Sequence, residues 1–244
     1  MSSESRRILF LSVAVESAEF QQYDMGDLTT CRHTDLPFWL SVHDLDSNAV
    51  EYINACDGGP LPGPSGFRGV LVGGSMYSSY ENRLWQQDLK SYLRNAFREA
   101  VPLLGVCGGH QLLVDALGGR VEANGRGRHI GAFPIHLTPS GQRDPFLAGV
   151  NDGALVQFVH GDIAVSLPAD AVALASADHD PNAVIRYSPT AVSTQFHLEF
   201  SRDAIAHLVH HYSGGTEVVK VGGQVDTVPL QRRLLLNWLH ELVA

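Results

Sequence analysis

Runs of consecutive apolar residues alternate with stretches of helical spacing in the first half of this 244-residue chain. The apolar runs predict buried strands at residues 8–14, 38–42, 67–72 and 101–106. A short helix is predicted at residues 47–53, where Ser47 can cap its start, and a longer one at residues 83–100. Strands that are apolar throughout and alternate with helices are typical of a parallel sheet covered on both faces.

The second half of the chain has shorter extended pieces separated by Pro, Gly and Asp turns. These pieces predict an antiparallel extension of the same sheet at residues 128–137, 154–159, 171–176 and 183–187. Residues 190–200 predict the last strand, and helices are expected at residues 201–212 and 229–239.

The predicted fold is therefore α/β with three layers: a mostly parallel central sheet flanked by helices, with a small antiparallel extension. Residues 16–35 are polar, weakly periodic and match no regular element. The Pro- and Gly-rich stretch at residues 57–66 favours a loop within one domain over a linker between two. We expect a single domain over residues 1–244, with residues 1–7 as a loose leader.

Composition narrows the class of function. Hydrophobic residues make up 44% of the chain, and the formal net charge is -9 with no run of Lys or Arg. This balance disfavours a partner that is nucleic acid or an anionic membrane, and the apolar run at residues 8–14 is too short to span a bilayer. Three widely spaced cysteines form no metal-binding or disulfide pattern, which favours a reducing, cytoplasmic location.

The stretch around Cys107 predicts a sharp turn between a strand and a helix. An apolar run arrives at Cys107, Gly105 and Gly109 stand two residues away on either side, and a helical pattern follows. This is the nucleophile-elbow arrangement with cysteine in the place of serine. The start of the helix directs the positive end of its dipole at the sulfur, which favours negative charge there. A buried cysteine that merely precedes a helix is the alternative interpretation.

A cysteine nucleophile needs a base and a group that orients the base. Alternate side chains of a strand share a face, so a strand at residues 190–200 would direct Gln195, His197 and Glu199 to one side. Glu199 could then hold the imidazole of His197 while that ring exchanges a proton with Cys107. The alternative is a solvated polar face on an edge strand.

Other histidines are weaker candidates. His110 could act as a rival base, but it lies at the start of the outgoing helix, where packing or a backbone bond is the better interpretation. His207, His210 and His211 fall on one predicted helix without a carboxylate or cysteine to complete a metal site.

Three motifs in order resemble those of the class I (triad-type) glutamine amidotransferases, in particular the stand-alone branch similar to GMP synthase. The chain reads Gly-Val-Cys-Gly-Gly-His-Gln at residues 105–111 and Gln-Phe-His-Leu-Glu at residues 195–199, and a strand ends in Val-Gly-Gly-Ser at residues 72–75. The family pattern has proline where this chain has Leu198. His-Gly-Asp at residues 160–162 matches a further element of that branch, with Val159 in the place of its usual serine.

The resemblance implies a flavodoxin-like fold and hydrolysis of the side-chain amide of glutamine. Cys107 would attack the amide, His197 would protonate the leaving ammonia, Glu199 would orient His197, and water would cleave the glutamyl thioester. The resemblance also implies an oxyanion hole at Gly73, Gly74 and Gly108.

The same resemblance implies substrate-binding roles for Gln111, His160 and Gly161, with no cofactor and no metal. The substrate would be glutamine or another γ-glutamyl compound. No synthetase domain fits in the remaining residues, so the ammonia would serve a separate synthetase.

Two other functions remain open at this stage. A γ-glutamyl peptidase or hydrolase would use the same triad on a different leaving group, and only the leaving-group pocket would differ. A non-catalytic binding or regulatory protein on this fold would not need Cys107, His197 and Glu199 together.

Overall fold

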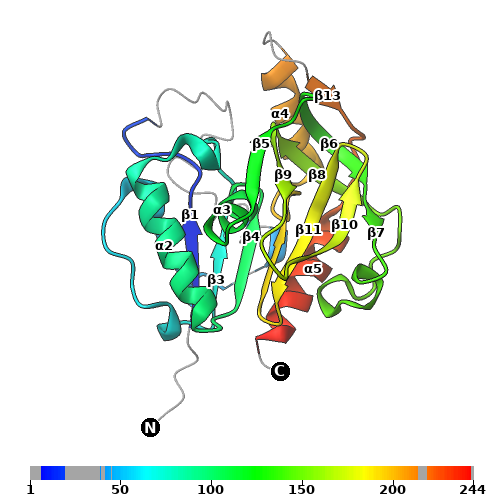
Figure 1. Cartoon of the computed structure of the whole chain (residues 1–244). Coiled ribbons are helices and arrows are strands. Elements are labelled where there is room, and N and C mark those ends of the chain that lie inside the picture. The colour runs from blue at the N-terminus through cyan, green and yellow to red at the C-terminus, as the bar shows by residue number, and fades with distance from the viewer. Residues whose placement is uncertain (1–6, 20–38, 40–41, 45, 214–218, 243–244) are drawn as a thin grey trace.

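A mostly parallel sheet runs through the middle of the molecule (Figure 1). The computed structural model describes residues 7–19, 39, 42–44, 46–213 and 219–242. Within these residues the central sheet has eight strands in the order β2-β1-β3-β4-β12-β11-β10-β7. The pairs from β2 to β12 are parallel and those from β12 to β7 are antiparallel. In chain order these strands are β1 Ile8–Ser12, β2 Val50–Asn54, β3 Gly69–Val72, β4 Leu103–Val106, β7 His136–Leu137, β10 Val172–Ala177, β11 Asp180–Ser188 and β12 Ala191–Thr194.

Helices cover both faces of this sheet because its central strands are apolar on both sides. Helices α2, Leu84–Arg98, and α3, Gly108–Ala116, pack on the face that buries Leu9 and Leu11 of β1. Helix α5, Val228–Glu241, packs on the opposite face, where Trp238 shares a core with Phe10. Figure 1 shows these layers, with α2 and α3 on the near side of the sheet and α5 behind it. The predicted α/β class and its parallel sheet between helices are confirmed.

The second half of the chain forms two further small sheets, so the prediction that all its strands extend the central sheet is only partly correct. Strands β7, β10 and β11 do extend the central sheet. Predicted strands 128–137 and 154–159 instead contribute mainly to a separate sheet, β13-β6-β8, and a pair β5-β9 stands beside it. The separate sheet buries Ile130 against helix α4, Arg202–Ser213, which gives it a core of its own. Its strands are β6 Arg128–Pro134, β8 Leu155–His160 and β13 Val219–Val221, and the pair is β5 Arg120–Ala123 with β9 Asp162–Ser166.

Two predictions near the N-terminus are wrong. Residues 47–53 were expected to be a helix, but Ser47–Ala49 is a single 3-10 turn and Val50–Asn54 is strand β2. The turn is capped by the side chain of Asp46, which accepts from the Asn48 amide, and β2 then pairs along β1. Further 3-10 turns among the described residues are η4 Ala55–Asp57, η5 Pro64–Gly66, η6 Ser79–Glu81, η7 Gly141–Arg143 and η8 Pro145–Leu147.

The strand expected at residues 38–42 is also wrong where it can be checked. Residues 38, 40 and 41 lie outside the described residues, and Trp39, Val42 and His43 are helical. The Trp39 ring is fully buried and stacks on His43 with ring centres 5.3 Å apart. The unassigned stretch 16–35 is described only to residue 19, and of the predicted leader only Arg7 is described.

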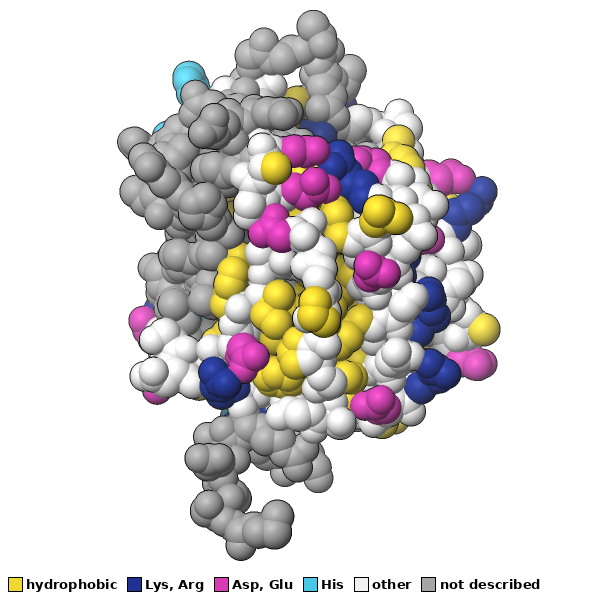
Figure 2. All heavy atoms as spheres, turned by 90° about the vertical axis from the view of Figure 1, so that its left-hand side faces the viewer, with side chains coloured by type: hydrophobic (Ala, Val, Ile, Leu, Met, Phe, Trp, Pro, Cys, Tyr) yellow, Lys and Arg dark blue, Asp and Glu magenta, His cyan; other side chains and the backbone are white. Residues whose placement is uncertain are grey.

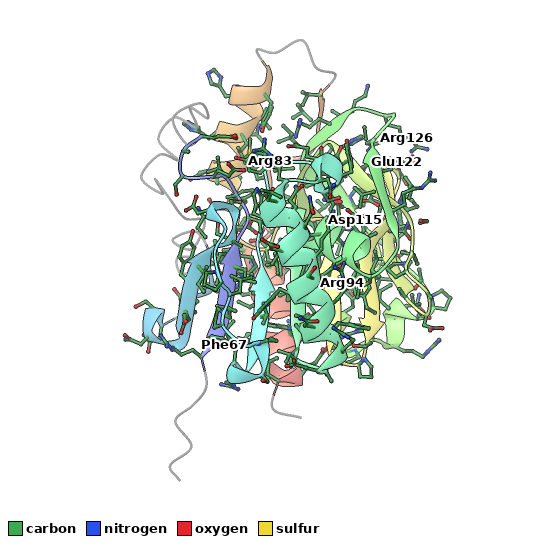
Figure 3. All side chains as sticks on the ribbon, turned by 60° about the vertical axis from the view of Figure 1, so that its left-hand side comes forward. Phe67, Arg83, Arg94, Asp115, Glu122 and Arg126 are labelled. Carbon is green, nitrogen blue, oxygen red and sulfur yellow. The ribbon has the colours of Figure 1, made fainter. Side chains whose placement is uncertain are left out.

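One end of the sheet collects the loops that follow the parallel strands. Figure 3 shows Arg83 at this end and Phe67 at the opposite end, before β3 begins. Arg83 forms ion pairs with Glu16, Glu19 and Glu81 at 2.8, 3.0 and 2.8 Å. Figure 2, which views the left-hand side of Figure 1, shows acidic and basic side chains together above an apolar area. Within the described part of the chain, no helix has the length and apolarity needed to cross a membrane.

Candidate active site

Cys107 stands at the sharp turn between β4 and α3. Its backbone has φ 50° and ψ −104°, a region that residues other than glycine rarely occupy. Two backbone hydrogen bonds hold this strained conformation: the Cys107 amide donates to Thr194 O at 2.8 Å, and the Gln111 amide donates to Cys107 O at 3.0 Å. The structure thus has the elbow geometry that the glycine spacing predicted.

The glycines around Cys107 are required because other backbone segments touch them. A Cβ atom on Gly109 would lie 2.2 Å from Val72 O, and one on Gly108 would lie 2.3 Å from the Cβ of Ser75. A Cβ on Gly105 would lie 2.6 Å from Gly109 O. The elbow is therefore pressed directly against the end of β3 and the loop that follows it.

His197 and Glu199 form a buried pair. The Nδ1 atom of His197 lies 2.7 Å from Oε1 of Glu199, and the two residues are 4% and 1% exposed. The other carboxylate oxygen, Oε2, accepts from the Leu198 amide at 2.8 Å. Leu198 stands where proline is usual in the family motif, and proline has no N–H, so this bond depends on the departure.

His197 and Glu199 form a pair, but the continuous strand that was predicted to place them on one face is wrong. Strand β12 ends at Thr194, and residues 195–200 are irregular apart from one bridge between Gln157 and His197. Glu199 reaches His197 through its side chain rather than through the alternation of a continuous strand. Phe196 and Leu198 are fully buried, as the apolar pattern predicted.

The sulfur of Cys107 and the imidazole of His197 meet at one backbone oxygen. Val159 O lies 3.6 Å from Sγ of Cys107 and 3.4 Å from Nε2 of His197. Burial by itself lowers the pKa of His197, but the charges of Glu199 and Cys107 outweigh burial and hold that pKa well above its usual range. The contribution of Val159 could not be found by residue type, because its carbonyl rather than its side chain makes the contact.

The three glycines predicted for an oxyanion hole differ in what their amides do. The Gly73 amide donates to Leu11 O at 3.1 Å, so it is occupied, and Gly73 O accepts from the Gly109 amide at 2.8 Å. Within the described residues no acceptor contacts the amides of Gly74 and Gly108. Gly74 lies beside Cys107 and His197, since a Cβ there would lie 3.0 Å from Cε1 of His197 and 3.8 Å from the Cβ of Cys107.

Two of the three residues predicted to bind substrate, Gln111 and His160, contact the same carbonyl, Asp162 O. Gln111 Nε2 donates to Asp162 O at 3.1 Å and to the side chain of Gln195 at 3.2 Å. His160 Nδ1 lies 2.8 Å from the same Asp162 O, and Gly161 O accepts from the Asn124 amide at 2.8 Å. These bonds join the α3 side of the site to the turn between β8 and β9.

Two other sequence candidates lie apart from this chemistry. His110 is fully buried with Nδ1 2.7 Å from the hydroxyl of Ser193, and burial lowers the pKa of His110 to about 3. His207 and His210 lie on α4, and the side chain of His211 lies outside the described residues. Across the described ranges, no group of three or more His, Cys, Asp or Glu side chains is arranged to hold a metal ion.

The chain matches only part of the length of its curated relatives. The chain is 32% identical over 169 residues to a GMP synthase (glutamine-hydrolysing) of Porphyromonas gingivalis, covering 69% of this chain and 30% of that protein. It is 33% identical over 156 residues to a GMP synthase (glutamine-hydrolysing) of Prochlorococcus marinus, covering 60% of this chain and 28% of that protein. The chain thus spans less than a third of the length of these relatives.

Solved structures agree with the fold over nearly all of the chain. A glutamine amidotransferase from Methylobacillus flagellatus has a TM-score of 0.73 at 17% identity, covering 97% of this chain and 95% of that one. A glutamine amidotransferase from Thermotoga maritima has a TM-score of 0.67 at 19% identity, covering 98% and 97%. The family model named glutamine amidotransferase class-I matches residues 42–209, more than half of the chain. The identification as an enzyme of this type is confirmed, and the chain belongs to the class-I glutamine amidotransferase family.

Proposed function

We propose that this protein hydrolyses the side-chain amide of glutamine with Cys107 as nucleophile, His197 as acid and base, and Glu199 as the group that orients His197. The observation that carries the proposal is the meeting of Cys107 Sγ and His197 Nε2 at Val159 O, with Glu199 on the other ring nitrogen. The relatives named as glutamine-hydrolysing GMP synthases support this choice of substrate.

The first half of the reaction forms a thioester. The Cys107 thiolate attacks the carboxamide carbon of glutamine, the carbonyl electron pair moves to oxygen, and a tetrahedral intermediate forms. His197, whose raised pKa keeps it protonated, then donates its proton to the nitrogen, and the C–N bond breaks to release ammonia. Glu199 compensates the charge of the imidazolium throughout, because its Oε1 accepts from Nδ1.

The second half returns the enzyme to its starting state. His197, now neutral, accepts a proton from water as that water attacks the thioester carbon. The C–S bond breaks, glutamate leaves, and Cys107 is again a thiolate beside a protonated His197.

The negative oxygen of both intermediates needs hydrogen-bond donors. We assign the amides of Gly74 and Gly108, because the Gly73 amide already donates to Leu11 O. Gly73 then has a supporting role, since its carbonyl holds the Gly109 amide at the start of α3. One such donor lowers the barrier by about 3 kcal/mol in a protease with an equivalent hole.

The substrate pocket is proposed to use Gln111, His160 and Gly161. Gln111 uses its Nε2 for Asp162 O and Gln195, and His160 contacts the same Asp162 O. Oε1 of Gln111 is then left as an acceptor for the substrate. Burial holds the pKa of His160 well below its usual range, so that ring stays neutral and supplies shape rather than charge.

We further propose that the described residues act as one amidotransferase domain in the cytoplasm. The ammonia would pass to an acceptor-activating synthetase outside these 244 residues. Curated GMP synthases extend well beyond the matched region, which supports a partner of that class.

The test is ammonia release from glutamine, with γ-glutamyl dipeptides as alternative substrates. Cys107→Ala should lower turnover by at least about 10⁴-fold, because loss of a nucleophile removes the covalent route. Cys56→Ala is the matched control, since Cys56 is also a buried cysteine outside any disulfide but lies away from the site. Wild-type ammonia release by Cys107→Ala would refute the mechanism, and turnover of dipeptides in preference to glutamine would favour the γ-glutamyl hydrolase instead.

A further inference from the structure

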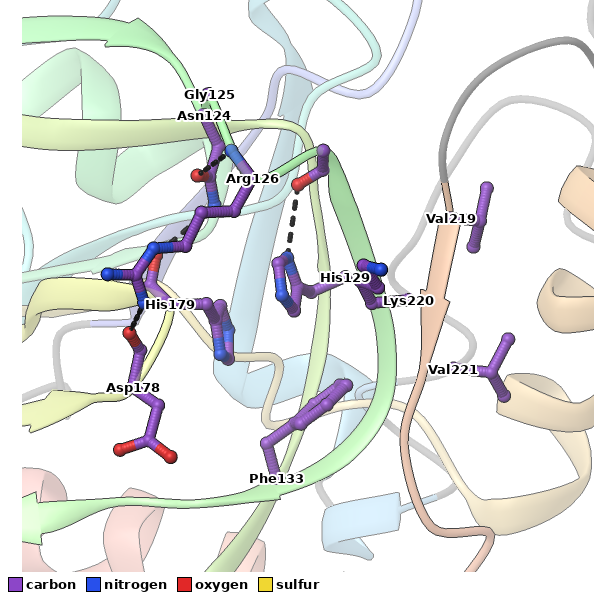
Figure 4. A pocket seen from close by; sticks show the side chains of 11 residues that line it. Asn124, Gly125, Arg126, His129, Phe133, Asp178, His179, Val219, Lys220 and Val221 are labelled. Atoms are coloured by element: carbon purple, nitrogen blue, oxygen red, sulfur yellow. Dashed lines mark hydrogen bonds between the residues drawn. The ribbon is translucent and has the colours of Figure 1, made fainter.

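A cavity of about 950 Å³ opens on the three-stranded sheet, away from the proposed reaction site. It is bounded by the loop after β5, by strands β6 and β13, and by the turn between β10 and β11. Figure 4 shows Arg126 and Asp178 on one side, Val219 and Val221 on the other, and aromatic rings between them. None of its lining residues belongs to the triad, the oxyanion turn or the predicted substrate residues.

The rim of this pocket carries two cations on a chain whose formal net charge is -9. Arg126 is held in place because its guanidinium donates to Asp178 O and its amide donates to Asn124 Oδ1 at 3.0 Å. Within the described residues Lys220 forms no ion pair, so its ammonium is available to a ligand. The one acidic lining residue, Asp178, has a side chain that is 88% exposed and lies 3.4 Å from His136, and Arg126 contacts its backbone carbonyl rather than its carboxylate.

The floor of the pocket is aromatic. The rings of His129 and His179 stack with centres 3.9 Å apart and planes 7° from parallel. Phe133 packs edge-on against both rings, and His179 Nε2 is buried with no partner among the described residues. Burial, together with the neighbouring His129, lowers the pKa of His179 to about 4 against the opposing charge of Asp178. Burial also lowers the pKa of His129, so both rings are neutral near pH 7.

We propose that this pocket is a second small-molecule site, which binds an organic anion with a flat apolar body. The body lies against the rings of His129, His179 and Phe133, and a carboxylate or phosphate group contacts Arg126 and Lys220. The cavity has the size of small-molecule sites, about 300–1,000 Å³, and a planar guanidinium suits either oxyanion. The positive rim above neutral rings selects an anion, while the aromatic floor and the two valines select against a bare inorganic ion. This site does not depend on glutamine hydrolysis.

The test uses four simple probes on the intact protein: benzoate, phenyl phosphate, inorganic phosphate and benzyl alcohol. Imidazole ¹H–¹⁵N NMR signals of His129 and His179 report binding at this pocket and not at the triad. We expect saturable shifts with benzoate or phenyl phosphate, at a dissociation constant on the order of 1 mM or tighter. The aromatic anion that binds more tightly identifies carboxylate or phosphate as the natural head group.

Two double variants distinguish binding by the charges of this pocket from an effect of the overall charge of the protein. Arg126→Gln with Lys220→Gln should weaken binding of the aromatic anion at least about tenfold, since both charge-assisted bonds are lost. Arg68→Gln with Arg98→Gln removes the same charge from exposed positions elsewhere and should leave binding unchanged. The proposal is overturned if neither aromatic anion saturates, if the first double variant binds as the wild type does, or if benzyl alcohol or inorganic phosphate binds as tightly as its aromatic counterpart.

Discussion

The proposed nucleophile, Cys107, and its proposed base, His197, are held in place by different means. Around Cys107, residues 103–111, the geometry comes from backbone packed on backbone, which leaves no room for side chains at Gly105, Gly108 and Gly109. Around His197, residues 195–199, the backbone is irregular, and a carboxylate that accepts from both the ring and the Leu198 amide fixes the geometry.

This difference shows what each half of the site tolerates. The Cys107 segment has no room at its three glycines, so a Cβ added at any of them must displace the neighbouring backbone or side chain. The His197 segment depends on two hydrogen bonds to one charged group, so replacing single atoms should impair chemistry while the fold persists. Substitutions of each kind can therefore separate stability from catalysis.

Glu199→Gln should give the largest effect and should act on chemistry. An amide in this position cannot stabilise the imidazolium, and the equivalent change in a Ser–His–Asp triad lowers the rate about 10⁴-fold, or about 5.5 kcal/mol. Single-turnover glutaminase assays measure the loss. A variant that keeps more than a tenth of wild-type kcat would show that Glu199 does not orient His197.

The titration of His197 tests whether Glu199 acts by stabilising the charged imidazole. Its pKa is held well above 6.5 by Glu199 and Cys107 against burial, so the wild-type ring should stay protonated well above that pH. Ammonia release then declines as pH rises through the raised pKa, because the neutral ring has no proton for the leaving nitrogen. Glu199→Gln should move the NMR titration of the ring to lower pH, and an unmoved titration would contradict the assigned charge.

Gly109→Ala should act on stability instead. Its Cβ would lie 2.2 Å from Val72 O, and relief of that contact requires β3 and α3 to separate. We expect a loss of about 3 kcal/mol in the free energy of unfolding, measured by urea denaturation. Gly63→Ala is the control, because Gly63 has φ −56° and open space around its Cβ position. Equal stability of the two variants would contradict the close packing of the turn.

Leu198→Pro should give the smallest effect. It restores the residue usual in the family motif and removes the N–H that donates to Glu199 Oε2. We expect kcat to fall about tenfold, corresponding to about 1.4 kcal/mol, with KM unchanged because the bond does not touch substrate. Leu198→Met keeps both the N–H and the volume of this fully buried side chain, and should retain wild-type kcat. A Pro variant with wild-type kcat would show that the bond is dispensable.

The parts of the site that sequence could predict are those set by local sterics. Gly105 and Gly109 on either side of Cys107 predicted the elbow, because only glycine permits such close approach of two backbones. The continuous apolar runs predicted the parallel sheet for a similarly local reason. His197 and Glu199 were paired correctly by spacing, although the strand assumed for them ends at Thr194.

The parts that sequence could not predict depend on long-range contacts or on main-chain atoms. Val159 O is a backbone acceptor that any residue would supply, so residue type carries no signal for it. Residues 47–53 were interpreted as helix because the strand character of residues 50–53 is realised only by pairing with β1. Likewise, β6 and β8 leave the central sheet because Ile130 finds its core under α4.

The register between β4 and β12 sets how far apart Cys107 and His197 lie in the proposed reaction. Val106 is paired with Thr194, so the nucleophile follows one strand by a single residue and the base follows the other by three. A slip of one residue in this ladder would displace the base by about 3.3 Å, enough to abolish proton transfer. The buried side chains along this register, Leu104 and Val192 among them, are therefore positioning residues for the proposed reaction.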